Sequence, residues 1–134
     1  MAVGVSLLTL VNVSHASDAE NSHFLYFPFD HVSMFAITVE NIERITNCRG
    51  DVDRSLWTEV QELIAAAPSS TSQLDEHLVR VVIRMRGVEQ PIVLDQNLVA
   101  RFGNKTAKLT DEQLASVLNR LRSTVPGARC VEAR

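Results

Sequence analysis

Residues 78–86 read LVRVVIRMR, and this segment decides the fold because its alternating pattern is the clearest in the chain. Successive side chains of a β-strand point to opposite faces of a sheet. We therefore predict a strand here. One face would carry Val79, Val81, Ile83 and Met85, and the other Arg80, Val82, Arg84 and Arg86.

Three shorter strands are predicted after this segment, separated by tight connections. Residues 87–91 turn into 92–94, residues 95–97 turn into 98–102, and residues 103–104 turn toward 106–109. Connections this short join antiparallel neighbours, whereas parallel strands need a long crossover. The second half of the chain therefore predicts an antiparallel meander.

The first half predicts two more strands and two helices. Residues 23–27 are rich in aromatic side chains and end at Pro28, and we expect a second strand over 32–37. Thr38 is a candidate N-cap for a short helix over 39–46, and Asp53 for a longer helix that ends at Pro68. The polar residues 69–73 then predict an exposed loop.

The last helix has the best-marked start. Thr110, with Gln113 three residues later, is typical of a capping box, and Pro126 ends the helix. The order of elements predicts an α+β protein, with a mainly antiparallel sheet and about three helices packed on one face. A chain of 134 residues, 46% of them hydrophobic, can close one core, so we expect a single domain over 17–134.

Residues 1–16 carry no charge and contain an apolar run that is too short to span a bilayer as a helix. Ser14 and Ala16 fit the small residues of a signal-peptidase site before Ser17. We expect residues 1–16 to be a signal peptide, and the mature protein to be periplasmic or secreted without a membrane span. The basic residues that normally open a signal peptide are missing, and the alternative is that residues 2–13 form a buried strand.

The two cysteines, Cys48 and Cys130, support the same compartment. A disulfide between them would tie the tail to the middle of the fold and stabilise it by roughly 4 kcal/mol. The alternative is two unpaired thiols in a cytosolic protein. Neither cysteine has the spacing of a redox or zinc motif.

The charges and motifs favour a protein partner over other ligands. Residues 1–76 carry 11 acids and 3 arginines, giving −8, and residues 77–134 carry 5 acids and 10 basic residues, giving +5. The net charge of −3 argues against nucleic acid. The glycines never form a phosphate loop, the histidines lack metal-ligand spacing, and no local signature marks Cys48 as a nucleophile. We expect no cofactor, no metal and no enzyme activity.

Three groups of residues are candidates for contact with a protein partner. They are the arginines of the face expected to be exposed, the polar loop, and a hairpin turn: Arg80, Arg84 and Arg86; Ser69, Ser70, Thr71 and Ser72; and Asp95, Gln96 and Asn97. Arginine is enriched at interface hot spots, and a stiff loop loses little entropy on binding. The alternative is that these side chains are solvated or pair with acids.

Residues 24–29, 37–43, 91–99 and 108–110 together resemble small bacterial immunity proteins of the periplasm. The resemblance extends over residues 23–122 as a pattern of elements. It implies a protein that inhibits a peptidoglycan-cutting effector by occluding its active site, for instance an amidase delivered by type VI secretion. The alternatives are a structural or adaptor subunit of an envelope assembly and, less favoured, a small hydrolase.

Overall fold

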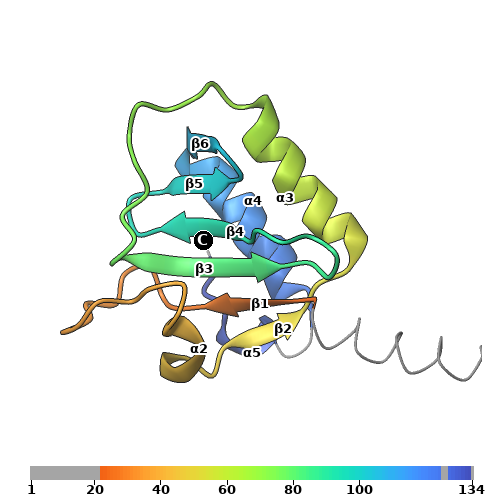
Figure 1. Ribbon diagram of the computed structural model, residues 1–134. Coiled ribbons are helices and arrows are strands. Elements are labelled where there is room, and N and C mark those ends of the chain that lie inside the picture. Colours follow the sequence, from red (N-terminus) through yellow and green to blue (C-terminus); the bar gives the residue numbers. More distant parts are fainter. Residues whose placement is uncertain (1–21, 125–126, 134) are drawn as a thin grey trace, which may run out of the picture.

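In the described part of the chain, six strands form one sheet. The computed structural model describes residues 22–124 and 127–133, so the signal peptide predicted over 1–16, and the alternative strand over 2–13, lie outside the described residues. The strands are β1 (His23–Tyr26), β2 (Arg49–Asp51), β3 (Val79–Arg84), β4 (Ile92–Asp95), β5 (Val99–Phe102) and β6 (Lys105–Lys108). Their order is β2-β1-β3-β4-β5-β6, and every neighbouring pair is antiparallel (Figure 1).

Two long and two short helices accompany the sheet in the described part of the chain. They are α2 (Ile42–Ile45), α3 (Arg54–Ala66), α4 (Asp111–Arg122) and α5 (Gly127–Cys130). Asp53 caps α3 by accepting a hydrogen bond from Leu56 N, and Thr110 forms a full capping box with Gln113. The caps predicted at Asp53 and Thr110 are confirmed, and so is the α+β class with a mainly antiparallel sheet. The cap predicted at Thr38 is wrong, because the short helix begins only at Ile42, with Asn41 as its N-cap and no side-chain cap bond.

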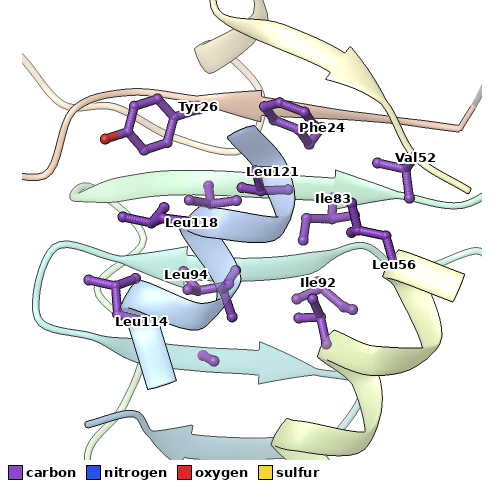
Figure 2. Packing of buried hydrophobic residues seen from close by; sticks show 14 of the residues in the cluster. Phe24, Tyr26, Val52, Leu56, Ile83, Ile92, Leu94, Leu114, Leu118 and Leu121 are labelled. Carbon is purple, nitrogen blue, oxygen red and sulfur yellow. The ribbon is translucent and has the colours of Figure 1, made fainter. Parts of the chain in front are cut away.

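The larger hydrophobic core lies between the sheet and the helices α3 and α4. Leu56 of α3 and Leu114, Leu118 and Leu121 of α4 are buried against β1, β3 and β4 (Figure 2). The edge of the Trp57 ring packs on Phe102 of β5, with 5.4 Å between ring centroids. The disulfide between Cys48 and Cys130 borders this core and holds α5 near β2.

A second, smaller core covers the opposite face of the sheet. Leu25, Val82 and Val93 from the strands pack there with Ile37 and Ile42 from the connection between β1 and β2. Because this connection and α2 lie over the strands, neither face of the central sheet is left to water. The central strands β3 and β4 are therefore buried on both faces, although they pair in the antiparallel direction.

A β-bulge in β3 changes the predicted faces of the LVRVVIRMR segment. Val79 lies opposite Asp95 and Val81 opposite Leu94, so Arg80 is an extra residue in this strand. A bulge bends the strand and shifts the alternation of its side chains. Val81, Ile83 and Met85 belong to the larger core as predicted, but Val79 joins Val82 in the smaller one.

Two elements differ from the sequence-based expectations for the first half. The strand predicted over 32–37 is wrong: Ile37 makes a single bridge to Leu78, and the residues before it form a loop. The strand β2 was not predicted from the sequence, and Gly50 lies in it opposite Phe24. A Cβ atom at Gly50 would stand 2.5 Å from the Phe24 ring and from Thr124 Oγ1, so this strand needs a glycine for close packing.

Candidate binding site

The described surface exposes three large hydrophobic side chains, and all three come from one loop. Val32, Met34 and Phe35 are 83%, 97% and 65% exposed. They belong to residues 30–36, which we call the 30–36 loop; Figure 1 shows it in orange, extending to the left of the sheet. Single exposed apolar residues are common, but a group of them on one loop indicates a surface for another molecule.

The start of the loop is fixed by main-chain and ring contacts. His31 N donates to Pro28 O at 3.3 Å, which closes a turn, and the His31 ring meets the Phe27 ring edge to face at 5.3 Å. Arg80 lies beneath this turn, where its Nη2 donates to His31 O at 3.2 Å and its guanidinium stacks over the Phe27 ring at 5.1 Å. The turn is therefore held from the sheet below it.

The end of the loop is fixed as well. Asn41 Nδ2 donates to Ala36 O at 2.9 Å, and Ile37 is bonded through its main chain to both His77 and Val79. Within the loop, Ser33 Oγ donates to Phe35 O at 2.7 Å and accepts from Phe35 N at 3.3 Å. The loop thus presents apolar side chains from a backbone that is already ordered, which lowers the entropy lost on binding.

A hollow of about 360 Å³ lies beside these exposed side chains. It is lined by the loop itself together with Phe27 and Ile45. The loop and the hollow offer an apolar projection next to an apolar recess, and both features suit the side chains of a protein partner better than a polar small molecule.

The charges around the loop are mainly acidic. Residues 30–46 contain Asp30, Glu40 and Glu43 against Arg44, which gives −2 with neutral histidine. All four side chains belong to exposed residues, and Glu43 lies 3.9 Å from Arg49. An apolar centre with an acidic surround is complementary to a partner whose apolar pocket has basic residues at its rim.

The arginine stripe that we predicted is not an exposed stripe. Arg80 is 1% exposed, because the bulge and the 30–36 loop bury it, so the expectation that Arg80 stands on an open face is wrong. Arg84 and Arg86 are half-buried. Burial lowers the pKa of Arg80, and the negative charge of Asp95 opposes this shift. Arg80 therefore supports the loop from below.

The predicted hairpin turn is built around a buried carboxylate. Asp95 is fully buried and accepts hydrogen bonds from Asn97 N at 2.8 Å, Val99 N at 3.0 Å and Asp75 N at 2.8 Å. Gln96 Oε1 accepts from Arg80 Nη2 at 3.3 Å, and Asn97 is exposed. The structure thus brings Arg80 and Gln96 together, but it removes Asp95 from any possible contact with a partner.

The predicted polar loop lies against an edge of the sheet. Ser70 N donates to Thr106 O at 2.9 Å and Thr106 Oγ1 donates to Ser70 O at 3.2 Å, which fixes the loop on β6. Ser69, Thr71 and Ser72 are exposed, as expected for this loop. Their role in binding stays a prediction, and the structure places them in a loop beside β6, whereas Arg80 and Arg84 belong to β3.

Sequence reasoning missed Val32, Met34 and Phe35, because Val and Phe favour strands and we read the segment as one. The signal that could have found the loop is the spacing of Pro28, Asp30 and Ser33, which are turn-forming residues. Such a cluster predicts a loop even where apolar residues intervene.

The described residues hold no group of three histidine, cysteine, aspartate or glutamate side chains placed to bind a metal ion. Likewise, none of the described helices combines the length and the apolar character needed to cross a membrane. A hollow of about 740 Å³ lies between the start of α3 and the end of α4. Asp53 lines it, but its carboxylate is already used as the cap of α3. No family model, curated protein or solved structure matches the chain.

Proposed function

We propose that this protein is an exported binding protein, without catalytic activity of its own, that inhibits a toxic effector enzyme. The 30–36 loop inserts into the active-site cleft of the effector and blocks access of the substrate. The observation that carries this proposal is the exposure of Val32, Met34 and Phe35 on a loop whose two ends are fixed by hydrogen bonds.

Physical arguments support the inserting role of this loop. Protein inhibitors gain affinity from a few anchoring side chains on a stiff backbone. Met34 and Phe35 are adjacent, and the Ser33 hydroxyl bonds hold the backbone between them. The acidic surround selects a cleft with a basic rim and speeds association with it.

The disulfide supports export, since such bonds persist in oxidising compartments. We therefore propose that the protein acts in the periplasm or outside the cell. The resemblance to periplasmic immunity proteins makes a peptidoglycan-cutting amidase the first effector to test.

The test is to co-express the tagged full-length chain with the product of the adjacent gene in an oxidising compartment. We expect the two proteins to copurify and the chain to rescue growth. The double variant Met34→Ser, Phe35→Ser should bind at least about 100-fold more weakly, since each apolar side chain buried on binding contributes about 1.5–3 kcal/mol.

A matched control is the double variant Ser69→Ala, Thr71→Ala, which changes two exposed residues of the loop on β6. It should bind like the wild type if the 30–36 loop is the inserting element, whereas a loss in this variant alone would support the predicted role of the polar loop. Equal losses in both double variants would contradict the 30–36 loop as the inserting element. A neighbouring product that neither binds nor harms the cell would contradict the inhibitor proposal and direct the search to an adaptor role.

A further inference from the structure

The C-terminal segment contacts Tyr26 and Phe29, which precede the 30–36 loop and which we call the loop root. After α4 the chain forms α5, whose Cys130 is bonded to Cys48 with 5.5 Å between the Cα atoms. Val131 follows and is buried in the larger core, with 4% of its surface exposed. Glu132 comes next, and it reaches the residues from which the loop starts.

Glu132 contacts the loop root through two hydrogen bonds to one carboxylate oxygen. Its Oε1 accepts from Phe29 N at 2.9 Å and from the hydroxyl of Tyr26. Both aromatic residues are buried, and their ring centroids are 6.2 Å apart. Hydrogen bonds to a charged acceptor are stronger than those between neutral groups, so Glu132 fixes the backbone at Phe29, one residue before the loop.

The two halves of the disulfide are anchored unequally. Cys48 O accepts from Tyr26 N at 3.0 Å, and Thr46 Oγ1 donates to Tyr26 O at 2.7 Å, so Cys48 stays on β1 without the disulfide. Cys130 ends a helix of four residues, which is too short to be stable by itself. The position of Glu132 therefore depends on the disulfide more than the position of Cys48 does.

We infer that the Cys48–Cys130 bond controls the binding conformation of the 30–36 loop, and that Glu132 is the positioning residue that transmits this control. This inference rests on the proposed function, because it concerns the same loop. The reaction is a thiol–disulfide exchange. The two thiols and one small disulfide, such as oxidised glutathione, yield the Cys48–Cys130 bond and two small thiols. The protein would thus bind its effector tightly only after it reaches an oxidising compartment.

The test compares the oxidised full-length chain with the same chain reduced by a small dithiol. The first readout is hydrogen exchange at the Phe29 amide, which needs no partner. We expect this exchange to become at least about tenfold faster on reduction, since loss of a local contact raises the open population. Binding to the effector should weaken about tenfold, in proportion to the fraction of competent loop.

The variant Glu132→Ala separates the positioning role from general destabilisation. In the oxidised protein it should accelerate Phe29 exchange and weaken binding about as much as reduction does, and reduction should then add little. Glu62→Ala, which removes an exposed carboxylate of α3, is the control and should change neither. Slow exchange at Val82 in the same samples would confirm that the sheet stays folded.

Unchanged Phe29 exchange in the reduced protein and in Glu132→Ala would overturn the inference. So would independent, additive losses of binding from the variant and from reduction. Faster exchange at Val82 on reduction would mean that the sheet also opens. In that case the oxidised Glu132→Ala protein, whose disulfide is intact, tests the positioning role of Glu132. If the oxidised wild-type chain does not bind the effector, the proposed function fails, while the exchange at Phe29 still tests the link between tail and loop.

Discussion

The 30–36 loop and the turn that follows β4 meet at the same side chain but are built in opposite ways. Arg80 donates to His31 O in the first and to Gln96 Oε1 in the second. The turn after β4 encloses a buried carboxylate that satisfies three backbone amides, whereas the 30–36 loop exposes apolar side chains to water. The turn after β4 therefore contributes to stability, whereas the 30–36 loop leaves its apolar side chains available for binding.

The largest expected effect comes from the carboxylate at the centre of the turn. Asp95→Ala should lower the free energy of unfolding by about 3–5 kcal/mol, because it leaves three backbone amides without their acceptor and removes a negative charge that favours the charged form of Arg80. Urea denaturation measures this loss. Asn97→Ala, at an exposed position two residues later, should change stability by less than about 0.5 kcal/mol. Similar values for both variants would contradict the central role of Asp95.

The second-largest loss of stability is expected for Arg80, because it donates hydrogen bonds to both the 30–36 loop and the turn after β4. Arg80→Met keeps much of the volume but removes the hydrogen bonds to His31, Gln96 and Val79. We expect a loss of about 2–3 kcal/mol, typical of hydrogen bonds to a charged group. Proteolysis within the 30–36 loop should also become faster, and an unchanged cleavage rate would show that the loop keeps its order without Arg80.

Tyr26, at the loop root, should make the free energy of unfolding depend on pH in the alkaline range. Burial first, and then Glu132, raises the pKa of Tyr26. The unfolded chain therefore loses this proton near its ordinary pKa of about 10, while the folded chain keeps it. The contribution of this protonated hydroxyl to the free energy of unfolding is fully present below about pH 10. Above that pH, the free energy of unfolding falls by about 1.4 kcal/mol per pH unit.

Tyr26 is the single tyrosine, so phenolate absorbance can follow this titration directly. Tyr26→Phe should reduce stability at neutral pH but weaken its dependence on alkaline pH. Phenolate formation near pH 10 in the folded wild-type protein would contradict the raised pKa.

The smallest expected effect on stability belongs to the side chains that we assign to the partner. Met34→Ser and Phe35→Ser together should change the free energy of unfolding by less than about 0.5 kcal/mol, because both side chains are exposed. Denaturation in urea would reveal a larger loss, and such a loss would mean that these residues support the fold instead of being held ready for a partner.

Local signals in the sequence predicted much of the fold. Asp53 and Thr110 were recognisable as caps, because a cap depends on residues within one turn of the helix. The meander of β3 to β6 followed from the short connections between alternating segments. The pairing of Cys48 with Cys130 is also confirmed, and there the chain offers a single choice.

The site was harder to predict because it depends on contacts between distant residues. Arg80 alternates with apolar residues in the sequence, and the bulge that buries it becomes visible only once β3 is paired with β4. Val32 and Phe35 have strand-forming side chains, yet none of the described strands pairs with them. Pairing and burial arise from tertiary structure, and single-sequence propensity does not contain them.

The bonds between Ser70 and Thr106 have a consequence for the behaviour of the protein at high concentration. An outer strand with unpaired backbone groups can add a strand from another molecule and so begin aggregation. Here the connection after α3 occupies part of the outer side of β6, and the other outer strand, β2, is only three residues long. Both outer strands are thus protected against pairing with strands of other molecules. This protection matters in a protein that also exposes apolar side chains on one loop.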